Sequence, residues 1–218
     1  MTVVARYYYS EGYKKKEISR LLETYITKSD ASANIVRWHD VIERLSRSAG
    51  RYPLVEIDSI QITEDELSVC RQLKGKQWQR LMFSLICFAK YYNAISDTNN
   101  GWTNRPDKEI FRAANVTTPI SRQSLMLNDL RAAGLIEFSK KVDSTNIRVT
   151  CLDYDGPVVL HITDFRNLGN QYSMLLGEPY MECESCGAVV RRTGRRQKYC
   201  KTCAPEINRI STLQKQAM

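Results

Sequence analysis

A run of apolar side chains between residues 78 and 92 constrains the fold of this chain more than any other feature. The apolar positions recur at spacings of three and four residues, which is the pattern of a helix that presents one stripe to a core. They are Trp78, Leu81, Met82, Leu85, Phe88, Ala89 and Tyr92. The sequence therefore predicts a buried helix, against which the neighbouring segments must pack.

The segments after this helix predict two further helices and a hairpin. Asn and Gly interrupt the periodicity in a loop at 97–106, and a short helix at 107–114 is followed by a turn at 116–120. Further on, the runs 135–140 and 147–152 are apolar and β-branched, and a polar linker joins them. Two such runs predict a β-hairpin.

The most specific string in this region lies in the predicted third helix, Ser121–Ala133. Ser121 is placed to cap its start, Leu127 and Leu130 face inward, and Gly134 suits the residue that follows a helix end. The order helix, helix, turn, helix, hairpin, with S-R-Q-S and then L-x-x-L-x-x-x-G-L-I, resembles winged helix-turn-helix domains of bacterial and phage regulators and replication initiators. The resemblance covers residues 76–152 and implies that the hairpin is the wing.

The same resemblance implies contacts to DNA, with the third helix in the major groove and the wing on the backbone or the adjacent minor groove. The helix residues expected at the nucleic acid are Ser121, Arg122, Gln123 and Asn128. The wing residues expected there are Lys140, Lys141, Asn146 and Arg148.

Four of the seven cysteines form two C-x-x-C pairs, and thirteen residues separate the pairs. These four are Cys183, Cys186, Cys200 and Cys203. Each C-x-x-C turn brings two thiolates to one ion, and two turns supply a closed tetrahedral shell, so the spacing predicts one structural Zn²⁺. An iron–sulfur centre or a redox pair is the alternative. The stretch resembles the zinc-ribbon family, and the resemblance rests on the four cysteines alone.

Basic residues are concentrated in and beside the segment between the two cysteine pairs. They are Arg191, Arg192, Arg195, Arg196, Lys198 and Lys201. A loop tip at Gly194 with flanking arginines is suited to phosphate or groove contacts, and a solvated charged face is the other interpretation. Val189–Val190 and Gln197–Tyr199 are predicted to form the two strands of the ribbon hairpin.

The first fifty residues predict a small helical unit. Amphipathic patterns predict helices at 14–28 and 31–48. The tyrosine triplet Tyr7–Tyr9 fits a short strand, an aromatic surface for stacking bases, or an ordinary packing element. The polar faces of both helices mix the two signs of charge, so the unit offers no evident surface for DNA.

The connecting segments carry further local signals. Residues 54–62 alternate as a strand does, and Thr63 with Glu66 forms a capping-box pattern for a short helix. Residues 157–162 predict another strand, and 164–180 a short helix or extended linker. The tail after residue 205 predicts a helix.

The expected fold class is α+β and mostly α, in five parts: an N-terminal helical unit (1–52), a connecting strand and helix (53–75), a winged helix-turn-helix (76–152), a strand and linker (153–180), and a zinc ribbon with a C-terminal helix (181–218).

The formal net charge of +8 is spread unevenly along the chain. Residues 76–152 hold eleven basic and six acidic side chains, whereas residues 1–75 are nearly balanced. A basic surface attracts phosphate backbones whatever their sequence, but an ordinary soluble basic protein has the same overall charge. The charge alone leaves both interpretations open.

The start of the chain lacks the ordered regions of a secretion signal, and no run approaches the roughly 20 apolar residues of a membrane helix. An odd number of cysteines, four of them in C-x-x-C pairs, is typical of metal binding in a reducing compartment. We therefore expect a protein of the bacterial cytoplasm with no membrane partner.

Residues for catalysis are sparse. The two histidines, His39 and His161, lie in a predicted helix and a predicted strand, and no H-x-E precedes the cysteine pairs as it does in zinc deaminases. The leading hypothesis is a non-enzymatic DNA-binding protein of a phage or mobile element that regulates transcription, replication or recombination. The whole chain also resembles uncharacterised phage proteins of Gram-positive hosts.

Two other partners fit the same features. A phage-encoded adaptor or inhibitor would use the winged helix and the basic ribbon to bind a host protein or nucleoprotein machine, such as a CRISPR effector. RNA binding through the aromatic N-terminus and the ribbon is a third hypothesis. Salt dependence distinguishes the DNA-binding hypothesis from the adaptor or inhibitor, because phosphate contacts weaken steeply with salt and an apolar interface does not.

Overall fold

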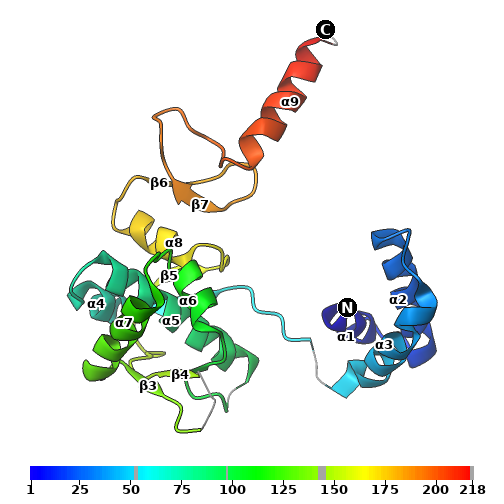
Figure 1. Cartoon of the computed structure of the whole chain (residues 1–218), viewed down its shortest axis with the longest axis horizontal. Helices are drawn as coiled ribbons and strands as arrows, with labels where there is room; N and C mark the ends of the chain where they lie inside the picture. Colours follow the sequence, from blue (N-terminus) through cyan, green and yellow to red (C-terminus); the bar gives the residue numbers. More distant parts are fainter. Residues whose placement is uncertain (52–53, 97, 142–145, 217–218) are drawn as a thin grey trace. The chain divides into compact units, whose positions relative to one another are not determined.

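A computed structural model describes residues 1–51, 54–96, 98–141 and 146–216 of the chain. The fold is α+β and mostly α, as predicted. The chain forms two compact units, Met1–Glu56 and Ile57–Met218, and Figure 1 colours them along the sequence. No helix in the described ranges is long and apolar enough to cross a lipid bilayer.

The N-terminal unit is built from three helices, α1 (Thr2–Ser10), α2 (Lys15–Ser29) and α3 (Ile35–Ser48), followed by a 3-10 turn (Ala49–Arg51). Its small core gathers the apolar stripe of α2 against α1 and α3. The core residues are Ala5, Ile18, Leu22, Ile26, Ile42 and Ala49.

Two predictions for this unit need correction. The tyrosine triplet lies within α1, so the strand interpretation is wrong, and the outer rings Tyr7 and Tyr9 are exposed. The helix predicted from residue 31 begins only at Ile35, because the Asn34 side-chain oxygen accepts the Val36 N–H at 3.0 Å. A side chain that satisfies an unpaired N–H of the first turn fixes where a helix starts.

The second unit is organised around α5 (Lys76–Ile95). The sequence pattern predicted one buried stripe, yet every residue from 81 to 90 is buried. The second face is covered by α4 (Glu64–Gln72) and α8 (Leu168–Leu175), which both pack on α5. An α-helix that is enclosed on all sides in this way forms the centre of the core.

A two-stranded antiparallel sheet joins the segments on either side of the central region. Strand β1 (Ile60–Thr63) pairs with β5 (Val158–Ile162), and Ile60 lies opposite Ile162. The strand predicted at 54–62 is therefore shorter than expected, since pairing with β5 starts only at Ile60. The predicted capping box forms at α4: Thr63 N–H donates to Glu66 Oε2 at 3.0 Å, and Glu66 N–H points to Thr63 Oγ1.

The elements after α5 run in the order strand, helix, helix, hairpin. They are β2 (Trp102–Thr103), α6 (Asp107–Ala113), α7 (Ile120–Ala132), β3 (Ile136–Phe138) and β4 (Ile147–Val149). The three strands form one antiparallel sheet in the order β2-β4-β3. The hairpin was predicted, but β2 lies in a stretch that was predicted to be a loop. Residues 142–145 of the predicted linker are outside the described residues.

The ends of α7 correct one prediction and agree with another. Ser121 is not the cap, because the helix begins at Ile120 and follows Pro119. Gly134 has a φ of 74°, and the Leu135 N–H donates to the Leu130 carbonyl at 3.0 Å. A left-handed residue followed by this bond is the Schellman ending that glycine favours.

The C-terminal part consists of β6 (Tyr180–Glu182), β7 (Val189–Arg191) and α9 (Cys203–Gln216). Strand β7 pairs with β6, so the predicted pairing of 189–190 with 197–199 is wrong. The Gln197 side chain instead closes a turn, accepting the Thr193 N–H at 2.7 Å and donating to the Tyr199 carbonyl at 3.1 Å. These side-chain bonds hold the backbone out of a second strand.

Helix α8 approaches the end of α6 so closely that only glycine fits at position 169. A Cβ on Gly169 would lie 1.9 Å from the Ala114 carbonyl oxygen, which belongs to the backbone and cannot swing away. Gly169→Ala is expected to lower the free energy of unfolding by about 1–3 kcal/mol, as overpacking does. The measurement is urea denaturation of the full chain.

The matched control for this variant is Gly194→Ala, since a Cβ at Gly194 meets nothing within 4 Å. It is expected to change stability by less than about 0.5 kcal/mol. Equal unfolding midpoints for the two variants would contradict the close approach of α8 to α6.

Candidate metal centre and nucleic-acid interface

The four cysteines of the two C-x-x-C pairs come together in space. Their Sγ atoms lie within 4.8 Å of one another, and Cys186 and Cys200 are 4.0 Å apart. In a tetrahedral shell with metal–sulfur bonds of about 2.3 Å, neighbouring sulfurs are roughly 3.8 Å apart. The cluster thus has the ligand number and nearly the spacing for one metal ion, as the sequence spacing predicted.

Backbone geometry prepares two of the four thiols, Cys183 and Cys200, to bind a cation. Gly187, with a φ of 71°, turns the chain so that its N–H donates to the Cys183 carbonyl at 2.8 Å. The Cys200 N–H donates to Cys183 Sγ at 3.2 Å, and this bond is the largest of several that lower the pKa of Cys183 to about 6. The Cys203 N–H likewise lowers the pKa of Cys200. A lowered pKa favours the thiolate, which is the form that binds metal.

The cysteine cluster and strands β6 and β7 are anchored to α8 through one buried side chain, Asn170. The Asn170 side-chain nitrogen donates to the Val189 carbonyl at 2.9 Å, and its oxygen accepts from Asn115 Nδ2 at 2.7 Å. Arg166 Nη2 also donates to the Cys186 carbonyl at 2.7 Å. Because Asn115 directly follows α6, this chain of bonds connects the cysteine-rich part to the central helices.

The six predicted basic residues of this part are all exposed. Arg191 ends β7, and the turn around Gly194 carries Arg192, Arg195 and Arg196. Within the described residues, Lys198 alone among the six forms an ion pair, to Glu184 at 3.4 Å. The exposed guanidinium groups therefore present positive charge to solvent, where a phosphate backbone can reach it.

Helix α7 has one face in the core and one in solvent. Met126, Leu127 and Leu130 are buried. With about 100° between successive residues, the centre of the opposite face is formed by positions 121, 125, 128 and 132. Ser121 and Asn128 of the predicted site lie on this outer face, and both are exposed.

The other two predicted residues of α7 do not lie on that face. Arg122 stacks over the Trp78 ring, 5.6 Å from its centroid, and it remains exposed. Gln123 is half-buried on the core side, and its Nε2 donates to the Thr118 carbonyl at 2.9 Å. Gln123 thus holds the turn before α7, a role that its residue type alone did not indicate.

Residues of α7 and of the β3–β4 hairpin share a hollow of about 250 Å³. Asn128 and Ser124 line it from α7, and Asn146 and Phe138 from the hairpin. Lys140 and Lys141 are exposed close to it along the chain. The structure thus brings one predicted helix residue, Asn128, and one predicted hairpin residue, Asn146, to the same hollow.

Arg148 occupies a different position from the other predicted residues of the hairpin. It lies opposite Glu137 and Trp102 in the sheet, and its Nη1 donates to Glu137 Oε2 at 3.3 Å. Its Nε also donates to the Asn100 carbonyl at 3.1 Å. Arg148 therefore connects β4 to β3 and to the loop before β2.

No family model, curated protein or solved structure matches this chain. Function is therefore inferred from its own residues.

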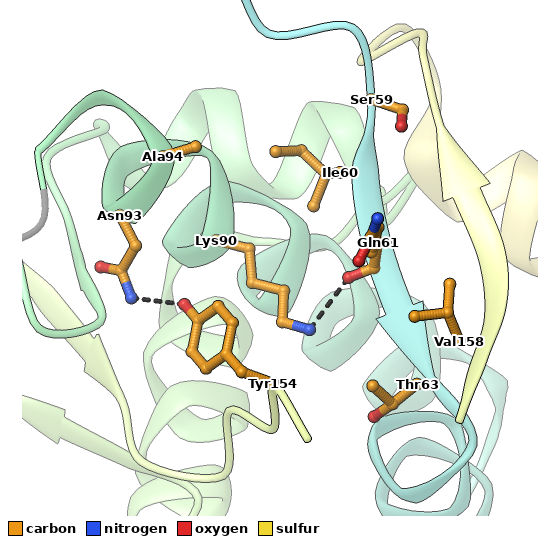
Figure 2. Close-up of a pocket in the computed structure, with 9 residues that line it drawn as sticks. All are labelled: Ser59, Ile60, Gln61, Thr63, Lys90, Asn93, Ala94, Tyr154 and Val158. Carbon is orange, nitrogen blue, oxygen red and sulfur yellow. Dashed lines mark hydrogen bonds between the residues drawn. The ribbon is translucent and has the colours of Figure 1, made fainter. Parts of the chain in front are cut away.

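A separate pocket of about 470 Å³ lies between β1, α5 and Tyr154 (Figure 2). Lys90 points into it and donates to the Gln61 carbonyl at 2.9 Å and to Glu66 Oε2 at 2.8 Å. The Lys90 ammonium also lies 4.8 Å from the centroid of the Tyr154 ring. The Lys90 ammonium is thus paired with the Glu66 carboxylate, and its bonds connect β1, α4 and α5.

Sequence reasoning missed three features of these sites. Lys90 was hidden in an apolar helix, and Asn170 stood in a stretch without a clear pattern. Leu125 is exposed on the outer face of α7, but an apolar residue in a helical pattern is normally assigned to the core. A helical projection of α7 centred on Met126, Leu127 and Leu130 would have placed Leu125 on the exposed face.

Proposed function

We propose that this chain is a non-enzymatic DNA-binding protein of a phage or mobile element, active in the host cytoplasm as a regulator of transcription, replication or recombination. In this proposal α5 to β4 form a winged helix-turn-helix, with α7 as the recognition helix and β3–β4 as the wing. The observation that carries it is the shared surface of α7 and the hairpin, where Asn128 and Asn146 line one hollow.

The positions of the exposed side chains support this proposal. A recognition helix needs polar side chains on its outer face, and α7 presents Ser121 and Asn128 there. Phosphate contacts need basic side chains at the edges, and Lys140 and Lys141 follow the wing strand. Asn128 Nδ2 donates to the Ser124 carbonyl at 2.9 Å, so it must exchange this bond for a base contact.

We further propose that the cysteine cluster holds one Zn²⁺. Four thiolates complete a tetrahedral shell and leave no position for a water, so the ion would stabilise the ribbon and take no part in a reaction. The ribbon would then hold its exposed arginines, Arg191, Arg192, Arg195 and Arg196, against the DNA backbone beside the winged helix.

The test is selection of binding sites from a random-sequence duplex pool by the full chain. Wild-type protein is expected to enrich a defined motif. Asn128→Ala is expected to relax the preference at one position of the motif, because a bidentate base contact contributes about 1–3 kcal/mol of discrimination. Arg191→Gln with Arg192→Gln is expected to weaken binding to all sequences alike, as loss of phosphate contacts does.

The control for this selection is Lys16→Gln in the N-terminal unit, which should leave both the motif and the affinity unchanged. An unenriched pool, together with a host protein that stays bound after nuclease and high salt, would replace this proposal with the adaptor or inhibitor. The exposed apolar side chain of Val36, in the N-terminal unit, is the observation that favours that second candidate.

A further inference from the structure

Leu125 is an apolar side chain in a position where α7 should be polar. It is 62% exposed, although Met126 and Leu127 beside it are buried. On the helical projection it lies on the outer face, about 40° from Ser121 and about 60° from Asn128. The leucine is therefore exposed where a ligand of the outer face of α7 would reach it.

The arrangement of exposed apolar side chains on α7 does not fit a protein-binding helix. The second one, Ile120, is 80% exposed but lies about 140° around the helix from Leu125. Helices that dock into protein grooves present several apolar anchors at spacings of three, four and seven residues on one face. Leu125 is instead the one large exposed apolar side chain on its face of α7, with Ser121, Arg122, Asn128 and Asp129 around it.

The major groove of DNA offers one apolar group on its base edges, the 5-methyl group of thymine. A leucine that enters the groove at the centre of a recognition helix can pack its branched end against that methyl. Exposed basic residues near α7, Arg122 and Arg131 on the helix and Lys140 after the wing strand, complement the phosphates on either side.

We propose that Leu125 contacts a thymine methyl and so makes the chain prefer a T·A pair at one position of its site. This inference rests on the proposed DNA-binding function and adds the base that α7 reads. Removing one buried methyl should weaken binding by about three- to tenfold, which is the size of effect expected when one such group is returned to water.

The experiment replaces each thymine of the selected site, one at a time, by deoxyuridine, which pairs in the same way but lacks the methyl group. Dissociation constants of the full chain are measured by fluorescence anisotropy. For the wild type, deoxyuridine at one position is expected to raise the dissociation constant three- to tenfold. At the other positions the dissociation constant should stay nearly unchanged. Leu125→Ala is expected to bind thymine and deoxyuridine at that position equally well.

The matched control is Ile120→Ala, which removes the other exposed apolar side chain of α7 and should keep the full deoxyuridine effect. Because both side chains are largely exposed, neither variant is expected to disturb folding. Sequence-specific binding without a deoxyuridine effect, or an undiminished effect in Leu125→Ala, would overturn this inference and leave the proposed function intact. Failure of the full chain to bind any duplex would overturn both.

Discussion

Cys200→Ala is expected to abolish metal binding and to unfold the segment between β6 and α9 while the central helices stay folded. The purified full chain should contain one metal ion, and the variant none. Removal of one thiolate leaves three ligands and an open position, and structural zinc sites contribute an apparent binding free energy of about 10–16 kcal/mol to folding. Loss of the ion therefore removes most of what orders this segment.

Two measurements check this result together. Metal content of the purified protein gives the stoichiometry and the identity of the ion, and amide hydrogen exchange locates the structural change. Exchange is expected to become fast through residues 180–203 and to stay slow in α5, whose residues 81–90 are all buried. Acid should release the ion as well, since protons compete with the metal for the thiolates.

The control is Cys151→Ala, which removes a half-buried cysteine outside the cluster. It should retain one ion per chain and normal exchange in the ribbon. A Cys200→Ala protein that still binds one ion, or a wild-type protein that loses its ion without any change in exchange, would contradict a structural metal centre.

The second large effect is expected for Lys90→Met, which should lower the free energy of unfolding by about 3–5 kcal/mol. The Lys90 side chain is 5% exposed and that of its partner Glu66 is 0% exposed. Without the ammonium, the carboxylate of Glu66 stays buried with only N–H donors, from Thr63 and Asp153, to stabilise it. A buried charge without a partner destabilises the folded state far more than the same charge in an ion pair.

A double variant separates this cause from lost packing. Lys90→Met combined with Glu66→Gln removes the buried charge and keeps one carbonyl oxygen, which can accept from one of the two N–H groups, because Thr63 donates to Oε2 and Asp153 to Oε1. It is expected to be more stable than Lys90→Met alone, by at least about 1 kcal/mol. Chemical denaturation of the full chain measures all of these differences.

The matched control is Arg71→Met, which breaks an ion pair with Glu64 on the surface of the same unit. Both partners are about half exposed, so the loss should not exceed about 1 kcal/mol. Equal losses for Arg71→Met and Lys90→Met would show that burial of the Lys90–Glu66 pair has no energetic consequence.

Features with local signals were predictable from the sequence. The capping box of Thr63 and Glu66 and the glycine ending of α7 depend on residues a few positions apart, and both are present. The cysteine cluster was predictable for a similar reason, because a C-x-x-C turn fixes two ligands locally and only the meeting of the two turns is non-local.

Features that depend on distant partners were not predictable. Strand β2 has only two residues and exists because it pairs with β4, more than forty residues further along the chain. The second buried face of α5 needs α4 and α8 to cover it, and no pattern within α5 indicates them.

The residues predicted to contact nucleic acid also divide into those placed by a local pattern and those placed by distant partners. Exposure of Ser121 and Asn128 follows from the helical period of α7. The bonds of Arg148 to Glu137 and to Asn100 depend on strand register, which the sequence leaves open. Residue type alone therefore did not distinguish a side chain available to a ligand from one already bonded within the sheet.

The salt dependence of duplex-DNA binding tests the central claim most directly. Each phosphate contact contributes about −0.9 to the slope of log K against log salt concentration. Wild-type chain is expected to show a steep slope, and Lys140→Gln with Lys141→Gln a slope smaller in magnitude by about 2. Lys16→Gln with Lys28→Gln, in the N-terminal unit, should leave the slope unchanged. Binding that is absent, or that does not change with salt, would contradict a DNA-binding function.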